Sequence, residues 1–199
     1  GLDKQTDIAV LKIDARDLPT VKLGRAQDAD ALIARFDQQL VPAQRMRLAQ
    51  MVAWHPTRRR LLISTRFGNT TQLHQVNGPG MDRTQLTFFR DGISNPAAAY
   101  EPARGDYFVF TKDTGGGAES VQIFRFDSAS GLTTMITDGK SRYGSPVWSH
   151  KGGLIAVESS RRNGKDRDFY VMNPLDPSSL KLVAENQGTW VVTRWSPDD

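Results

Sequence analysis

The chain has 199 residues and a net charge of +4; 24% of its residues are charged and 38% are hydrophobic. This balance excludes a disordered polyelectrolyte, and no apolar run approaches the roughly 18 residues that a transmembrane helix needs. Because the chain has no cysteine, it has no disulfide, no thiol chemistry and no cysteine metal site. Basic residues are scattered among acidic ones, so we expect neither nucleic acid nor a membrane as a partner.

The first 45 residues do not share the pattern of the rest of the chain. Residues 6–13 are predicted to form a strand, and residues 18–24 a second extended segment. Residues 25–45 are expected to be a linker with a short helix that Asp30 caps and that ends near Leu40. Residues 46–54 then enter the region that repeats.

From residue 46 onward, an aromatic residue followed within two positions by Pro or His recurs four times. The copies begin at Trp54, Tyr100, Trp148 and Trp195, at spacings of 46, 48 and 47 residues. A period in the forties with strand-like content is typical of β-propellers, in which each repeat is a four-stranded blade. The aromatic residues fall inside strand-like segments, so we expect them in the core.

The internal order of each repeat is the same. An apolar run follows the aromatic residue, and then come a polar turn, a third strand and a short closing strand. The apolar runs are 61–63, 107–110 and 154–157; the third strands are 72–76, 122–126 and 169–172; the closing strands are 85–87, 135–137 and 180–183.

This order predicts an all-β fold, a partial β-propeller of three four-stranded blades plus the first strand of a fourth, with a short N-terminal extension. The blades are expected at residues 46–92, 93–140 and 141–187, and residues 188–199 begin the next one. An ordinary β-sandwich with chance periodicity is the alternative. The segment 190–195 is apolar and lacks the rest of its blade, so we expect self-association through this open edge.

Six segments of the repeat region carry a family resemblance. They are 53–57, 85–89, 137–142, 146–150, 170–174 and 195–199, the last being Trp-Ser-Pro-Asp-Asp. With them, residues 45–199 resemble the N-terminal β-propeller of the prolyl oligopeptidase family of serine peptidases, especially its bacterial members. The Trp-Ser-Pro-Asp turn also resembles the TolB-type binding propellers.

The first resemblance implies a module that does no chemistry itself. In that family the propeller gates the access of short peptides to a hydrolase domain, which this chain lacks. The second resemblance implies, as the alternative, a propeller that docks a protein partner. The resemblance implies a bacterial protein of the cytoplasm or the periplasm and does not choose between them.

Residues 1–24 carry a different resemblance. Asp3 and the segments 6–13 and 18–24 resemble one hairpin of the HtrA-type trypsin-fold proteases, and the match places Asp7 at the triad aspartate. The histidine and Gly-Asn-Ser-Gly-Gly segments of that family are missing, so Asp7 lacks catalytic partners. A fragment, a fusion or a chimera with an HtrA-type segment is therefore the second alternative.

No catalytic constellation in the sequence is complete. The chain has three histidines, His55, His74 and His150, and no Gly-x-Ser-x-Gly elbow. The residues 139–141 end like a phosphate-binding loop but lack its first glycine, so we interpret them as a turn between blades. We therefore expect no metal or other cofactor. The resemblance is to part of a hydrolase, and the activity of this chain itself is left open.

One basic residue follows the second strand of each repeat. Arg66, Lys112 and Arg161 lie 12, 12 and 13 residues beyond the aromatic residue. The same position in each blade would place them on one face, as an arc that attracts acidic peptides or peptide C-termini. The alternative is three solvated hairpin charges, each of little energetic weight.

Overall fold

The computed structural model describes residues 49–66, 70–93, 96–115 and 120–199. The chain divides into two compact units, Gly1–Met46 and Arg47–Asp199, and all described residues belong to the second. The predicted HtrA-like segment with Asp7 and the predicted helix from Asp30 lie outside the described residues. The described part holds no helix of the length and apolarity that a membrane span requires.

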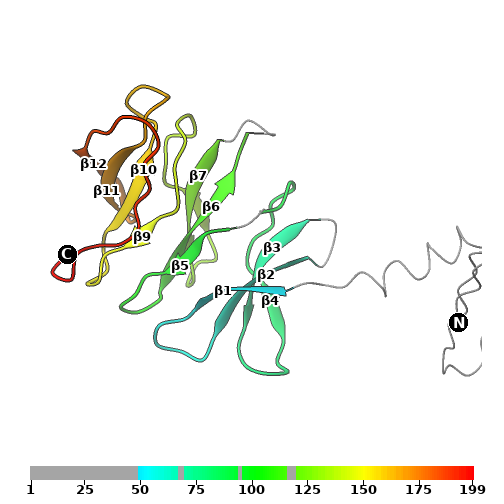
Figure 1. Ribbon diagram of the computed structural model, residues 1–199. Coiled ribbons are helices and arrows are strands. Elements are labelled where there is room, and N and C mark those ends of the chain that lie inside the picture. The colour runs from blue at the N-terminus through cyan, green and yellow to red at the C-terminus, as the bar shows by residue number, and fades with distance from the viewer. Residues whose placement is uncertain (1–48, 67–69, 94–95, 116–119) are drawn as a thin grey trace, which may run out of the picture. The chain divides into compact units, whose positions relative to one another are not determined.

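The described residues form three antiparallel sheets of four strands each (Figure 1). This confirms the predicted fold class, an all-β partial propeller, and we call the sheets the first, second and third blade. The first blade contains β1 (Ala49–Trp54), β2 (Leu61–Arg66), β3 (Thr71–Val76) and β4 (Arg83–Gln85); the second contains β5 (Ala98–Tyr100), β6 (Tyr107–Asp113), β7 (Val121–Asp127) and β8 (Thr133–Met135); the third contains β9 (Val147–Trp148), β10 (Ile155–Ser159), β11 (Asp168–Asn173) and β12 (Asp176–Ala184).

Alternating side chains on β6 and β7 build the core on both sides of the second blade. Phe108 and Phe124 belong to a buried cluster with Leu62 and Leu73 of the first blade. Val109, one residue after Phe108, and Ile123, one residue before Phe124, belong to a second cluster with residues of the third blade. Because successive strand residues point to opposite faces, one blade can bury apolar side chains against both of its neighbours.

Two tryptophans of the repeat, Trp148 and Trp195, join the third blade to the second and the C-terminal segment to the third blade. The indole N–H of Trp148 donates to Ala99 O at 3.2 Å, and that of Trp195 donates to Val147 O at 2.9 Å. Trp148 also packs edge-on against Tyr107, with ring centroids 5.8 Å apart. The equivalent residue of the first blade, Trp54, is 64% exposed, so the prediction that the aromatic residues form core is wrong for it. The reason is that no blade precedes the first one among the described residues.

The short turn after each first strand is closed by the residue that follows the aromatic one. The imidazole Nδ1 of buried His55 accepts the backbone N–H of Thr57 and of Arg58, each at 3.2 Å. In the second blade, the carboxylate of Glu101 accepts three backbone amides of its turn. Gly105 completes that turn with φ near 71°, a backbone conformation that glycine adopts at low cost.

The closing strands of the first two blades end earlier than predicted, at Gln85 and Met135. A threonine hydroxyl interrupts each ladder: Leu73 N donates to Thr87 Oγ1 at 2.9 Å, and Ile123 N donates to Thr137 Oγ1 at 3.1 Å. The third closing strand is longer than predicted, because β12 spans Asp176–Ala184. It lacks such a threonine contact, and its pairing with β11 continues over Phe169–Asn173.

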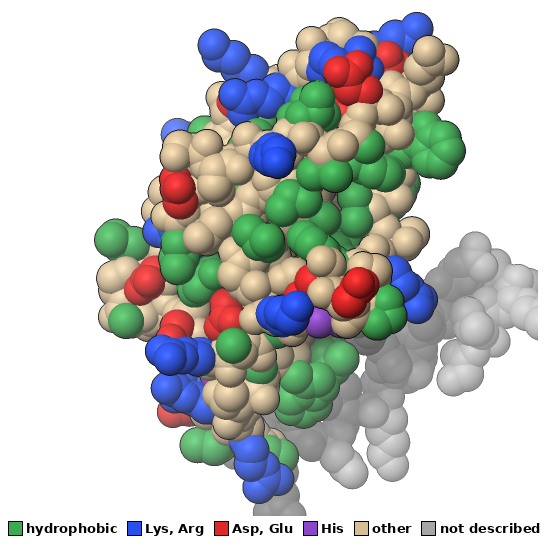
Figure 2. Space-filling model, turned by 90° about the vertical axis from the view of Figure 1, so that its left-hand side faces the viewer, with side chains coloured by type: hydrophobic (Ala, Val, Ile, Leu, Met, Phe, Trp, Pro, Cys, Tyr) green, Lys and Arg blue, Asp and Glu red, His purple; other side chains and the backbone are tan. Residues whose placement is uncertain are grey.

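The segment 190–195 pairs with no strand among the described residues. It lies against the third blade, where Trp195 donates to Val147 O and Val192 N lies 3.4 Å from Glu158 Oε2. Exposed apolar side chains of this end of the molecule are Leu175, Val183, Trp190 and Val191. The view from the side of the third blade shows hydrophobic side chains gathered across it, with charged ones at the margins (Figure 2).

Candidate functional site

The histidines occupy structural positions rather than a catalytic one. His55 is buried and accepts two backbone amides of its own turn. His74 is buried on β3, and its Nδ1 lies 3.1 Å from Gln72 O. His150 is exposed, with Nδ1 3.6 Å from a carboxylate oxygen of Asp199. Among the described residues, no three His, Asp or Glu side chains gather as metal ligands would.

The three basic residues that the sequence places together do not share one position in the ladders. Lys112 lies opposite Gln122, whereas Arg66 lies one residue beyond the position opposite Gln72. Arg161 follows the end of β10. Because side chains alternate along a strand, Arg66 and Lys112 point to opposite faces of their blades. The register does not test whether the three residues surround one mouth of the propeller, so the arc and the binding role of each residue stay predictions.

Lys112 forms an ion pair at the boundary between the first and second blades. Its side chain is only 6% exposed, and its ammonium donates to Asp91 Oδ2 at 2.6 Å and to Asp113 O at 2.9 Å. The ammonium also lies 5.0 Å from the centroid of the Phe89 ring. The hydrogen bond from Lys112 lowers the pKa of Asp91, which keeps this carboxylate charged. This charge therefore serves the packing of two blades.

Arg161 occupies a more open position at the next boundary. Its side chain is 50% exposed, and its Nη1 lies 4.0 Å from Asp138 Oδ2. Asp138 is already engaged within its own loop, because it accepts the backbone amides of Lys140 and Ser141 and the hydroxyl of Ser141 at 2.7 Å. Burial alone would raise the pKa of Asp138, but these hydrogen bonds lower it. The neighbouring Tyr143 hydroxyl raises the pKa of Arg161, so the guanidinium stays charged.

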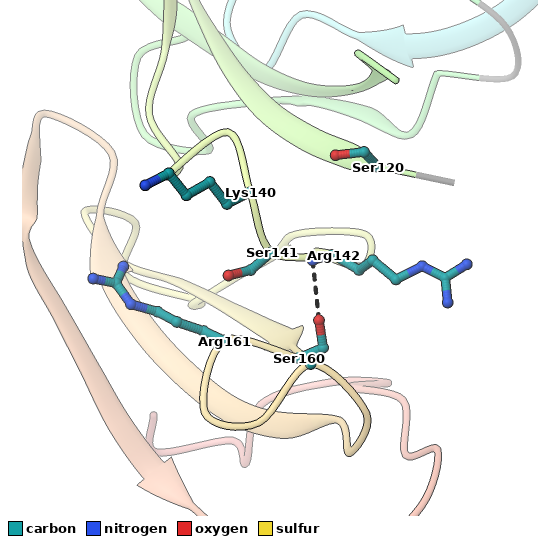
Figure 3. A pocket seen from close by; sticks show the side chains of 7 residues that line it. Ser120, Lys140, Ser141, Arg142, Ser160 and Arg161 are labelled. Carbon is teal, nitrogen blue, oxygen red and sulfur yellow. Dashed lines mark hydrogen bonds between the residues drawn. The ribbon is translucent and has the colours of Figure 1, made fainter. Parts of the chain in front are cut away.

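A hollow of about 470 Å³ lies in front of Arg161, between the second and third blades (Figure 3). The loop after β8 forms one wall, and Gln122 holds it by donating to Ser141 O at 2.6 Å and accepting Gly139 N at 2.9 Å. The turn after β10 forms the other wall, where Ser160 Oγ accepts Arg142 N at 3.1 Å. The residues that line the hollow are Ser120, Lys140, Ser141, Arg142, Ser160, Arg161 and Gly164.

The chemistry of this hollow is that of an anion site. As far as the described residues show, its lining has three cations and no carboxylate. Lys140 and Arg161 extend toward the same side, and Arg142 extends to the other (Figure 3). The serines provide hydroxyl groups, and that of Ser141 donates to Asp138, but no histidine of the described lining stands beside them as a base. The sequence analysis missed Lys140, although the Asp-Gly-Lys-Ser turn that places it was visible as a junction between blades.

No protein-family model matches the chain, and no curated protein matches it. Solved structures do match. TolB from Acinetobacter baumannii has a TM-score of 0.53 and 21% identity, over 70% of this chain and 33% of that one. A putative TolB from Agrobacterium tumefaciens has a TM-score of 0.52 and 19% identity, over 67% of this chain and 45% of that one. A structure from a study of two prolyl endopeptidases has a TM-score of 0.52 and 19% identity, over 82% of this chain and 27% of that one.

These likenesses define the class of the molecule as a β-propeller, in agreement with the three four-stranded sheets. The chain spans less than half of the length of each of these solved structures. At this level of identity they show the fold alone. The predicted resemblance to a propeller is therefore confirmed, while no comparison supports the HtrA-like segment.

Proposed function

We propose that this chain is the non-catalytic propeller portion of a serine peptidase of the prolyl oligopeptidase type, which limits the access of short peptides to a hydrolase domain. The sequence resemblance over residues 45–199 supports this proposal, as does the likeness to a prolyl endopeptidase over 82% of the chain. One observation carries it. The basic hollow beside Arg161 offers charge for holding peptide ends but, among its described lining residues, no histidine that could activate its serines.

A fluorophosphonate probe tests the non-catalytic part of this proposal. We expect the purified chain to take up no label and to hydrolyse no peptide or ester, because His55 and His74 serve a turn and the core and exposed His150 faces Asp199. An active serine peptidase labelled in parallel controls for the quality of the probe. Stoichiometric labelling of one serine of this chain would refute the proposal.

The coding sequence that follows Asp199 tests the gating part. A hydrolase domain with a Gly-x-Ser-x-Gly elbow would support a peptidase, and the full protein should then cleave short peptides much faster than folded proteins. A stop codon after a few further blades would refute it.

A TolB-like propeller that docks a protein partner is the second candidate function. The likeness to two TolB structures favours it, with TM-scores of 0.53 and 0.52. The same coding sequence separates the two candidates, because a binding propeller needs no hydrolase domain.

A further inference from the structure

The two blade boundaries carry the same ion pair in two different states. In each, a cation at the end of the second strand of one blade, or just after it, faces an aspartate in the loop that enters that blade. At the first boundary Lys112 and Asp91 are 2.6 Å apart, and the lysine side chain is 6% exposed. At the second boundary Arg161 and Asp138 are 4.0 Å apart, and the arginine side chain is 50% exposed. The first pair is closed, and the second is open to a hollow.

The open state follows from the hydrogen bonds of Asp138. Its carboxylate closes its own loop through Lys140 N, Ser141 N and Ser141 Oγ. Little of its hydrogen-bonding capacity is left for the five N–H donors of Arg161. The ammonium of Lys140 extends to the same side of the hollow, and among the described residues it forms no ion pair or hydrogen bond of its own (Figure 3).

The Ser160 hydroxyl does not belong to this pair of cations. Ser160 is 3% exposed, and its hydroxyl oxygen accepts Arg142 N at 3.1 Å, away from the tips of Lys140 and Arg161 (Figure 3). The planar guanidinium and the ammonium on one side of the hollow match the acceptor oxygens of a carboxylate.

We propose that this hollow binds a peptide carboxylate, held by Arg161 and Lys140. The choice of a peptide as the source of the carboxylate rests on the proposed function. The peptide carboxylate accepts the N–H groups of the Arg161 guanidinium that Asp138 does not engage. The hollow thereby gives the propeller an anchor for one end or one acidic side chain of a passing peptide.

Titration of the full chain with short peptides tests the ligand. The probes are an N-acetylated tetra-alanine with a free carboxyl end, its C-terminal amide, the amide with one internal Glu, and inorganic phosphate. We expect the free acid to bind at least about tenfold more tightly than the plain amide, with affinity falling as salt is added. Binding of the amide that contains Glu would assign the site to acidic side chains as well. Equal binding of acid and plain amide, or tighter binding of phosphate, would overturn the proposal.

Variants of the two cations test the residues. We expect Arg161→Gln and Lys140→Gln each to weaken binding of the free acid about tenfold, and Arg161→Lys to lie between wild type and Arg161→Gln. Lys165→Gln is the matched control, because Lys165 is an exposed cation of the same turn that does not line the hollow. Urea unfolding of each variant separates a lost ligand contact from a lost fold.

An equal loss in the control and in Arg161→Gln would leave only a general charge effect and would overturn the proposal. The two proposals fail separately. Absence of carboxylate binding would refute the carboxylate site and not the non-catalytic role. A labelled serine would refute the non-catalytic role and not the carboxylate site.

Discussion

Replacement of Gln122 by Ala tests how the loop of the carboxylate site is held. Gln122 is fully buried on β7, and its side-chain amide reaches across to the loop after β8. It donates to Ser141 O at 2.6 Å and accepts Thr137 Oγ1 at 2.7 Å and Gly139 N at 2.9 Å. Gln72 makes the same kind of clasp in the first blade. The substitution of Gln122 removes these three short hydrogen bonds at once, together with a longer one that its amide donates to Ser120 Oγ at 3.4 Å.

The size of the expected loss follows from what the substitution leaves behind. A buried polar group without a partner costs about 1–3 kcal/mol. The carbonyl of Ser141 and the amide of Gly139 lie in a surface loop, so water can take over part of their hydrogen bonding. We therefore expect Gln122→Ala to lower the free energy of unfolding by about 3 kcal/mol rather than by the full sum of three losses.

Urea unfolding followed by circular dichroism measures this loss, and hydrogen exchange of the Gly139 amide locates it. Gln75→Ala is the control, because Gln75 is half-buried in β3 and its amide donates only to Asn77. Its expected loss is about 0.5 kcal/mol, as for other substitutions near the surface. If Gln122→Ala cost no more than the control, or the Gly139 amide stayed protected, the clasp would not hold the loop and the reasoning would be refuted.

Three further predictions concern other contacts. Trp148→Phe should lower the free energy of unfolding in urea by about 1–2 kcal/mol, because it removes an inter-blade hydrogen bond. Trp54→Phe, at an exposed position, should lower it by less than about 0.5 kcal/mol. Burial and neighbouring arginines lower the pKa of His55, so stability should fall as the pH drops below about 6.5, a dependence that His55→Asn should remove. The hydrogen bond from Arg162 lowers the pKa of Asp168, so the stability that this carboxylate contributes should persist above pH 4 and be lost as the pH falls below it. Thermal unfolding of Asp168→Asn should not show this loss.

The repeat of the sequence predicted the fold because blade architecture is encoded locally. An aromatic residue, an apolar run and a polar turn recur at a fixed period, and each unit can form its sheet from consecutive strands. Alternation along β7 also places Ile123 and Phe124 on opposite faces, against different neighbours. The ends of the closing strands were missed, because they depend on where the hydroxyls of Thr87 and Thr137 intercept a backbone amide.

The candidate site depended on contacts that no local pattern contains. Lys112 and Arg161 look alike in the sequence, yet Asp91 neutralises the first and Asp138 leaves the second open. The difference arises from which groups each aspartate accepts, and this is decided by the conformation of two separate loops. Lys140 was assigned to a plain turn for the same reason, since its neighbour Arg161 lies on another blade.

The hydrogen bonds of Gln122 and the carboxylate site involve the same loop after β8. Replacing Gln122 should therefore change both stability and binding, whereas replacing Arg161 should change binding alone. Gln122 touches no part of the proposed ligand, but it fixes the loop that carries Lys140. We therefore expect Gln122→Ala to lose both about 3 kcal/mol of stability and several-fold in affinity for the free-acid peptide, because the loop must then be ordered on binding. Arg161→Gln, at a half-exposed site with an ion pair of 4.0 Å, should lose affinity while its stability changes by less than about 1 kcal/mol. Binding titrations and urea unfolding of both variants decide this. Unchanged affinity in Gln122→Ala would mean that Lys140 needs no fixed loop to reach its ligand, and then only Arg161 would hold the carboxylate in a defined place.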